Sequence, residues 1–342
     1  MTSAATPPAP TVVRLGTRAS LLAMTQSRLV ARALEEAHAA AHPSGPALRV
    51  ELVEISTLGD RSSAPLEQLG GTGVFVTAVR AAVLGGRCDV AVHSLKDLPT
   101  GAAVGLAPPV VPPRADPRDA LCARDGLDLA SLPAGAVVGT GAPRRRAALL
   151  AARPDLEVVG LRGNVDSRLA RVGADLDAVI LAVAGLARID RLDAATSLLD
   201  PAEFPPAPGQ GALAVEVLAS LDSASPLAGA LAAIDHAPTR LAVLAERAVL
   251  ARLEAGCSAP VGAIGRVEGG RLTLTASAFA ADGATWVDAH GSIEVSDGEG
   301  LGDPAAGADR AVVSDDDAAL ALGTRLADEL LAGGARELAA PS

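Results

Sequence analysis

The sequence predicts two successive α/β domains followed by a smaller α+β domain. Through most of the chain, short β-rich runs alternate with helical stretches in two blocks, which is the βαβ pattern of a parallel sheet. Two proline-rich stretches, 108–117 and 204–208, punctuate these blocks. Beyond residue 260 the pattern changes to three consecutive strand-like runs and a last helix. A chain of 342 residues is long enough for two or three such domains.

The first block begins with a predicted strand at Val12–Leu15. Ser20 then caps a helix that runs to about Ala41, because its side chain can accept a hydrogen bond from the first turn. A strand, a helix and another strand follow at Leu48–Ile55, Val74–Leu84 and Cys88–Val92.

The second block repeats this alternation. Its strands are predicted at Ala136–Val138, Glu157–Leu161 and Ala178–Leu181, and its helices at Arg145–Ala152 and Val165–Val172. A strand at Ala212–Val217 and a helix at Thr239–Leu253 come next. The last part has predicted strands at Val261–Val267, Leu272–Ala280 and Thr285–Ile293, an acidic loop at 297–317 and a helix at Ala318–Leu331.

These patterns give the expected domain boundaries. The first domain comprises 12–112 with 212–230, the second 113–211 and the third 234–342, after a disordered lead-in at 1–11.

Composition excludes several classes of function. The net charge of −11 argues against a nucleic acid or an anionic membrane surface as the main partner. No apolar run approaches the roughly 18 to 20 residues of a membrane span, and the N-terminus lacks the features of a secretory signal. Three cysteines without a CxxC pair favour a reducing cytoplasm. No histidine or cysteine pair has the spacing of metal ligands, so no metal site is predicted.

A polar segment follows the third predicted strand. His93, Ser94, Lys96 and Asp97 stand within five residues, and Pro99 biases the chain before it towards an extended conformation. A single aspartate in a loop is more often a turn residue. However, ligands of open α/β sheets bind at the carboxyl ends of the strands, so four polar groups at that end favour a site.

Arginines gather after several predicted strands of this acidic protein. They are Arg18, Arg144, Arg145, Arg146, Arg162, Arg168 and Arg188. Solvated surface charges are the plain alternative. A positive charge at the N-terminus of a helix opposes the helix dipole unless an anion accompanies it. Because guanidinium groups pair bidentately with carboxylates, the pattern favours a ligand with several carboxylates.

Cys257 lies in a predicted loop between a helix and a strand, after Gly256 and before Pro260. Free cysteines are usually buried packing residues, as we expect for Cys88 and Cys122. A cysteine in such a loop can also be an exposed nucleophile. The motif alone leaves both roles of Cys257 open.

Eight runs of the sequence together resemble the porphobilinogen deaminase family. They are Arg14–Ser20, Gly70–Phe75, Val92–Pro99, Gly139–Arg145, Leu161–Val165, Ala182–Leu186, Pro208–Ala212 and Leu253–Cys257. The runs occur in the family's order and spacing from about residue 12 to 337. Each run is a weak signal alone, but the ordered set is specific.

The resemblance implies two periplasmic-binding-protein-like α/β domains and a smaller α+β C-terminal domain. It also implies a cytoplasmic, monomeric transferase that deaminates four porphobilinogen molecules and joins them head to tail into hydroxymethylbilane, in tetrapyrrole biosynthesis. A dipyrromethane cofactor would be held by a thioether at Cys257.

The resemblance further assigns roles to individual residues. Asp97 would be the catalytic carboxylate, contacting pyrrole nitrogens. The expected cofactor-binding residues are Ser94, Lys96, Thr140, Arg144, Arg145, Arg162 and Arg168. The expected substrate-binding residues are Arg18, Ser20, Gln26, Phe75, Arg188 and Gln210. The chain departs from the usual family pattern at Gln68, Thr72, Ala142, Pro143 and Ala187, which puts secondary contacts in doubt but not the reaction.

Two other functions are compatible with parts of this sequence. A non-enzymatic carboxylate-binding protein with two α/β domains is permitted by the fold, but it gives no reason for a third domain presenting Cys257. A thiol enzyme using Cys257 as a transient nucleophile would need a nearby base, and none of the five histidines is adjacent to it in sequence.

Overall fold

The computed structural model describes residues 9–56, 73–253, 260–296 and 314–338, except for the side chains of 73–75. The chain divides into two units. Unit 1 comprises Met1–Pro113 and Leu213–His236, and unit 2 comprises Arg114–Ala212 and Ala237–Ser342.

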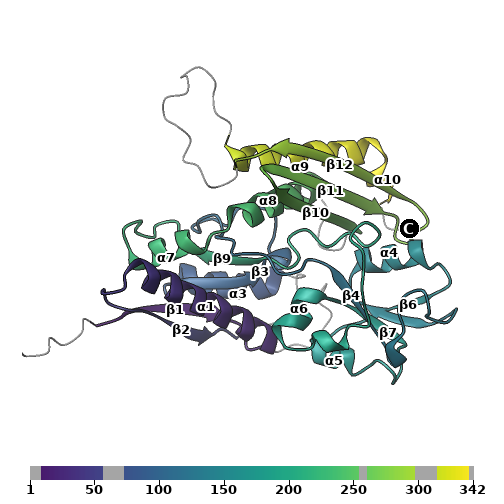
Figure 1. Cartoon of the computed structure of the whole chain (residues 1–342), viewed down its shortest axis with the longest axis horizontal. Coiled ribbons are helices and arrows are strands. Elements are labelled where there is room, and N and C mark those ends of the chain that lie inside the picture. The colour runs from purple at the N-terminus through teal and green to yellow at the C-terminus, as the bar shows by residue number, and fades with distance from the viewer. Residues whose placement is uncertain (1–8, 57–72, 254–259, 297–313, 339–342) are drawn as a thin grey trace, which may run out of the picture. The chain divides into compact units, whose positions relative to one another are not determined.

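Unit 1 is built on a four-stranded sheet with the order β2-β1-β3-β9 (Figure 1). Its strands are β1 (Thr11–Thr17), β2 (Leu48–Glu54), β3 (Val90–Ser94) and β9 (Leu213–Val217). β1 runs parallel to β2 and β3, whereas β9 runs antiparallel to β3. The strand that closes this sheet therefore comes from far along the chain.

Helices cover both faces of this sheet. One core contains α1 (Leu21–Ala41), α7 (Pro226–Ile234) and the side chains of Val90 and Val92. The other contains α3 (Gly73–Leu84) and Ala91. Successive residues of β3 thus alternate between the two cores, as the pleat of a strand requires. Because both faces are covered, β3 is buried from Val90 to His93 and is apolar up to His93.

The first part of unit 2 is a five-stranded sheet with the order β6-β5-β7-β4-β8. Its strands are β4 (Asp119–Ala123), β5 (Val137–Thr140), β6 (Glu157–Gly160), β7 (Ala178–Ala182) and β8 (Ser197–Leu198). Helix α4 (Pro143–Ala152) packs in the core on one face, and α6 (Val183–Arg188) in the core on the other, to which α5 (Val165–Leu169) contributes. β4 is antiparallel to β7, while β5 is parallel to β6 and β7.

The second part of unit 2 is an antiparallel sheet with helices on one side (Figure 1). The strands are β10 (Val261–Glu268), β11 (Arg271–Phe279) and β12 (Trp286–Glu294), and the helices are α8 (Ala237–Arg252), α9 (Asp315–Ala332) and α10 (Ala335–Leu338). The core between them is made of Ala, Leu and Val side chains. Small residues let the helices approach closely: a Cβ at Gly323 of α9 would lie 2.1 Å from the carbonyl oxygen of Ala245.

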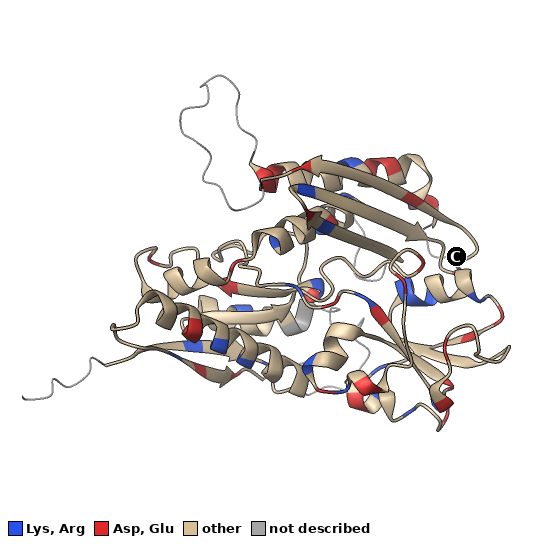
Figure 2. Ribbon diagram, in the orientation of Figure 1, with Lys and Arg blue, Asp and Glu red and all other residues tan. Residues whose placement is uncertain are grey.

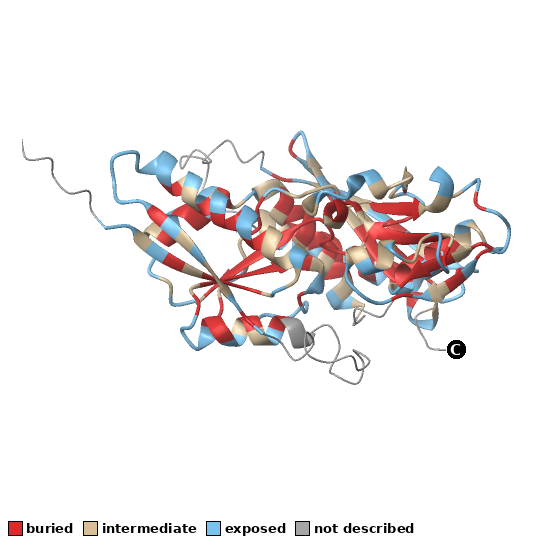
Figure 3. Ribbon diagram, turned by 90° about the horizontal axis from the view of Figure 1, so that it is seen from below, coloured by how far each residue is buried: buried red, intermediate tan, exposed pale blue. Residues whose placement is uncertain are grey.

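The predicted fold class is confirmed: two α/β sheets are followed by a smaller α+β part, and each core is buried between its layers (Figure 3). Each predicted strand occurs with slightly shifted ends. The expectation of parallel sheets is wrong for β4 and β9, because a short buried strand has the same pattern in either direction. β4, β8, α6, α7 and α10 were not predicted. Helix α9 starts at Asp315, before its expected start, because Ser314 caps it.

The three-domain division remains a prediction. The predicted second and third domains both lie in unit 2. Most of the acidic 297–317 segment and the 1–11 lead-in lie outside the described residues. None of the described helices is both long and apolar enough to cross a membrane.

Candidate active site

Asp97 stands on a short turn at the carboxyl end of β3. Leu95–Asp97 form one turn of 3-10 helix, closed by the Leu98 amide donating to the Leu95 carbonyl at 3.1 Å. Leu98 is extended, as the following proline requires. Leu95 and Leu98 are buried and fix the turn from both sides, whereas Asp97 is exposed. The turn thus presents the carboxyl group outwards from the sheet.

Asp97 combines access to water with dense protein surroundings. The surrounding protein displaces enough water to raise the pKa of the carboxyl group above its ordinary value. The positive charges of Lys96 and Arg18 act in the opposite direction, because they favour the carboxylate.

The other predicted site residues of unit 1 lie around the turn. Gln26 of α1 is buried and donates from Nε2 to the Ser94 hydroxyl at 2.9 Å. Ser20 caps α1, its hydroxyl accepting from the Ala23 amide at 3.4 Å. Arg18 follows β1 and is half-buried. The structure therefore brings Arg18, Lys96 and Asp97 into one electrostatic neighbourhood, with Gln26 holding Ser94 at its edge.

His93 points to the interior of unit 1 rather than into the turn. It is buried on the face of β3 that α3 covers, and its Nε2 lies 3.4 Å from Oε2 of Glu216. Burial lowers the pKa of His93 to about 4, so the imidazole is neutral at neutral pH. Glu216 and its partner Arg80 were missed by the sequence analysis, although a charged residue inside an apolar strand, Leu213–Val217, was a signal.

Arg144 and Arg145 of unit 2 are buried around a carboxylate of the chain itself. Figure 2 colours the lysines and arginines of the ribbon blue and the aspartates and glutamates red. Arg144 donates to Asp119 Oδ2 at 2.8 Å and Arg145 to Oδ1 at 2.7 Å. Burial disfavours the Asp119 carboxylate, but the two guanidinium groups hold its pKa well below its ordinary value. This internal anion explains how two arginines can occupy the first turn of α4. Asp119 was not singled out from the sequence.

Gln210 and Thr140 belong to the same interior. Gln210 is buried and donates from Nε2 to Asp119 Oδ1 and to the Pro117 carbonyl, both at 2.8 Å. The Thr140 hydroxyl, at the end of β5, accepts from the Ala142 amide at 3.3 Å. Gln210 therefore helps to hold Asp119 in place, and Thr140 holds the backbone just before the helix that carries Arg144 and Arg145.

A second buried carboxylate fixes the loop that carries Gln210. Glu246 of α8 is fully buried and accepts two hydrogen bonds from Arg114, at 2.6 and 3.0 Å. It also accepts from the amides of Gly209 and Gly265, at 2.7 and 2.8 Å. One carboxylate therefore ties the Pro208–Ala212 loop to both a helix and a strand of the C-terminal part.

Three further arginines differ from this pair. Arg162 is exposed after β6. Arg168 donates to the Gly163 carbonyl at 2.8 Å, and Arg188 to the Gly211 carbonyl at 2.7 Å. In the described part of the chain, neither Arg168 nor Arg188 contacts a carboxylate. Burial lowers the pKa of both, that of Arg188 to about 10. Cations held among protein without a counter-ion fit a ligand that brings its own carboxylates.

Several predictions fall on residues outside this description. Cys257, Gln68 and Thr72 lie outside the described residues, as does the side chain of Phe75.

Cys88 and Cys122 are buried, as expected for packing residues, and burial raises the pKa of the Cys122 thiol to about 11.

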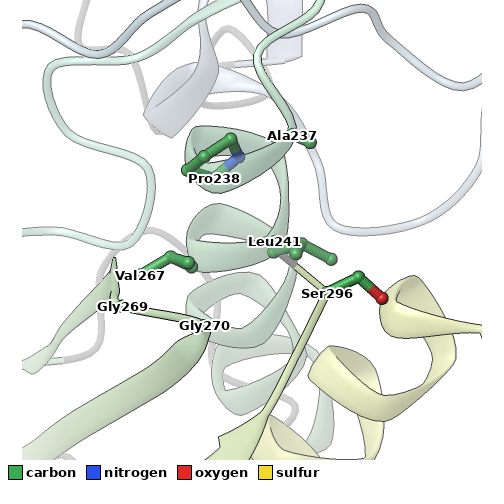
Figure 4. Close-up of a pocket in the computed structure, with 7 residues that line it drawn as sticks. All are labelled: Ala237, Pro238, Leu241, Val267, Gly269, Gly270 and Ser296. Carbon is green, nitrogen blue, oxygen red and sulfur yellow. The ribbon is translucent and has the colours of Figure 1, made fainter. Parts of the chain in front are cut away.

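A small cavity in the C-terminal part of unit 2 is chemically different from these sites (Figure 4). Its volume is about 160 Å³. The lining residues are Ala237, Pro238, Leu241, Val267, Gly269, Gly270 and Ser296. Because none of them is charged, the cavity does not suit a ligand with several carboxylates.

Comparison with known proteins gives consistent matches along the chain. The profile described as "Porphobilinogen deaminase, dipyromethane cofactor binding domain" matches residues 13–225, and that of the "Porphobilinogen deaminase, C-terminal domain" matches 240–332. The porphobilinogen deaminase of Leifsonia xyli subsp. xyli is 51% identical, covering 96% of this chain and 94% of the relative. The enzyme of that name from Cutibacterium acnes is 49% identical, covering 96% of both chains.

Solved structures match less closely. The methionine-binding protein MetQ is 10% identical, covers 65% of this chain and 89% of its own, and has a TM-score of 0.39.

Proposed function

The chain belongs to the porphobilinogen deaminase family, and we propose that Asp97 is the carboxylate through which it performs the reaction of that family. The protein is a transferase of tetrapyrrole biosynthesis that deaminates porphobilinogen and joins four molecules head to tail into hydroxymethylbilane. Its cofactor is a dipyrromethane. The observation that supports the role of Asp97 is its outward position on a fixed turn at the end of β3, beside Arg18 and Lys96.

The chemistry requires an anion at the reacting pyrrole. Breaking the carbon–nitrogen bond of porphobilinogen releases ammonia and leaves a methylene-pyrrole cation whose charge is shared with the ring nitrogen. A carboxylate facing that nitrogen stabilises the cation. A carbon–carbon bond then forms to the acceptor pyrrole, which loses a proton to restore its aromatic ring, and Asp97 can accept this proton.

The surroundings of Asp97 suit both tasks. Its raised pKa makes the carboxylate a better base than an ordinary aspartate, while Lys96 and Arg18 favour the charged form. Activity that needs the carboxylate should therefore fall as pH decreases through a pKa higher than that of an ordinary aspartate.

The cofactor supplies the acceptor pyrrole on which the chain is extended. We propose that Cys257 holds it by a thioether and that arginines of the chain bind the acetate and propionate groups of cofactor and substrate. Arg168 and Arg188 have the strongest support, because they contact no carboxylate in the described chain. Arg144 and Arg145 carry one more positive charge than Asp119 neutralises, so they can also face an added carboxylate.

The remaining predicted properties are proposals of the same kind. We propose a cytoplasmic monomer in three domains that acts on a small molecule and not on nucleic acid or membranes. The net charge of −11 supports the absence of nucleic-acid and membrane partners, and the free Cys88 and Cys122 support a reducing compartment.

Replacement of Asp97 tests the catalytic assignment. Asp97→Asn removes the charge and keeps the size, so we expect kcat to fall by at least about a hundredfold. Porphobilinogen consumption by the cofactor-loaded enzyme measures this. Asp89→Asn is the matched control, because Asp89 precedes the same strand at its opposite end. Near-normal turnover of Asp97→Asn would refute the assignment.

Intact mass tests the cofactor site. The purified protein, incubated with porphobilinogen if needed, should gain the mass of two linked pyrroles on the peptide that contains Cys257. Cys257→Ser should lack this gain, while Cys88→Ser should retain it. A gain located on any other residue would contradict the proposal.

A further inference from the structure

Strand β10 lies against the backbone segment that Arg144 binds. Arg144, in the first turn of α4, donates from Nη1 to the Pro205 carbonyl at 2.6 Å. The next residue, Pro206, accepts a hydrogen bond from the Ala263 amide of β10 at 2.9 Å. Gly262 of the same strand approaches Pro205 so closely that an added Cβ would lie 2.5 Å from the carbonyl oxygen. Glycine weakens a strand and often marks such a close approach of another backbone, so β10 holds this acceptor of Arg144 in place.

The hairpin between β11 and β12 lies against the later turns of the same helix. Gly283, in the turn of this hairpin, has a φ of +73°. An added Cβ there would lie 2.4 Å from the carbonyl oxygen of Ala147 and 2.6 Å from the amide nitrogen of Ala151. Phe279, the last residue of β11, is buried in the same core as Ala147. The backbone of the hairpin therefore rests directly on the backbone of α4.

Helix α4 connects both contacts to the arginine pair. It is 10 residues long, and its first turn carries Arg144 and Arg145. Because hydrogen bonds between successive turns make a helix stiff, a shift of α4 at either contact also moves the guanidinium groups. In the sequence, β10 begins four residues after Cys257. The part of the chain proposed to hold the cofactor is thus the part that contacts α4.

We propose that Gly262 and Gly283 are positioning residues through which the C-terminal sheet places Arg144 and Arg145 against the carboxylates of the cofactor. Each glycine acts through α4 and not by contact with the ligand. The inference rests on the proposed function, in which arginines of the chain bind those carboxylates.

Two glycine variants test the two contacts in the cofactor-loaded enzyme, with loading verified by intact mass. Gly262→Ala and Gly283→Ala each place a Cβ where the backbone of a neighbour stands, so the arginine pair is displaced. We expect kcat to fall about tenfold and the KM for porphobilinogen to change less than about twofold, because an acceptor pyrrole held out of line reacts more slowly.

Two further glycines of the same sheet provide matched controls. At Gly291 of β12 an added Cβ would meet side chains of α9, the nearest atom being Arg325 Nη2 at 2.6 Å. Gly269, in the turn between β10 and β11, shares the positive φ of Gly283, but an added Cβ would have no other described atom within 4 Å. Gly291→Ala and Gly269→Ala should keep kcat within about twofold of wild type.

A double-mutant cycle tests whether the effect of Gly262 passes through Arg144. Arg144→Gln removes the group that binds Pro205, while Arg145 still pairs with Asp119 at 2.7 Å. In this background Gly262→Ala should lower kcat by less than about twofold, because no arginine remains on the Pro205 carbonyl. A further fall of about tenfold would show independent effects and would overturn the proposal for this contact.

Hydrogen exchange tests the same coupling without activity and without a glycine variant. Energetic coupling is reciprocal, so Arg144→Gln should speed the exchange of the β10 peptide Val261–Glu268 about tenfold. Arg153→Gln is the control, because Arg153 at the other end of α4 also binds a carbonyl, that of Leu129, at 2.6 Å, and a carboxylate, that of Asp155, at 2.7 Å. Unchanged β10 exchange in Arg144→Gln, or an equal increase in Arg153→Gln, would overturn the coupling even if a glycine variant fails to fold.

The outcomes separate this inference from the function on which it rests. Wild-type kcat in Gly262→Ala and Gly283→Ala, or an equal fall in their controls, would overturn the positioning role and leave the reaction of the enzyme intact. A wild-type enzyme that does not consume porphobilinogen would instead overturn the proposed function.

Discussion

The buried imidazole of His93 should make unit 1 sensitive to mild acid. In the folded chain burial lowers the pKa of His93 from 6.5 to about 4. An unfolded chain therefore binds a proton on this side chain below about pH 6.5, while the folded chain does not bind it until about pH 4. The free energy of unfolding therefore has its full value above the pKa that His93 has in the unfolded chain. It decreases as the pH falls towards the pKa that His93 has in the folded chain. At about 1.36 kcal/mol per pKa unit, this loss is about 3 kcal/mol.

His93→Gln isolates this effect, because glutamine does not titrate and its amide can still face Glu216. We expect wild type to lose about 3 kcal/mol more than His93→Gln between about pH 7 and about pH 4. Urea unfolding measures the difference, and hydrogen exchange of peptides covering β3 and β9 assigns it to unit 1. His290→Gln, at an exposed position of β12, is the control. Equal acid sensitivity of wild type and His93→Gln would refute the reasoning.

Three further predictions concern unit 2. Asp119→Asn should lower the free energy of unfolding in urea by about 3 to 5 kcal/mol, because it leaves Arg144 and Arg145 buried without their counter-ion. A decrease below about 1 kcal/mol, which is the range of a surface ion pair, would contradict this. Gly211→Ala should destabilise more than Gly135→Ala: both have positive φ, but only at Gly211 would the new Cβ meet a backbone oxygen, at 2.5 Å. Arg188→Gln should raise the KM for porphobilinogen about tenfold by removing a charge-assisted contact, and unchanged KM would exclude that role.

Local sequence patterns were sufficient for most elements of this fold. The cap at Ser20 and the extended residue before Pro99 depend on neighbours within three or four positions, so both could be predicted. The position of Asp97 after β3 could be predicted for the same reason, since the strand pattern ends where the polar residues begin. The direction of β4 and β9 could not, because a fully buried strand shows no signal of its partner.

The sequence by itself determined the alternation of strands and helices, the family and the residues at the ends of the strands. Only the tertiary structure decided which of those residues are available to a ligand. Arg144 and Arg188 look alike in sequence, but Asp119 neutralises the first, whereas the second contacts a carbonyl. Arg80 and Glu216 meet across 136 positions of the chain. The charge around a buried group depends on partners that only packing brings within a few ångströms. Local sequence patterns do not identify these partners, because they are distant along the chain.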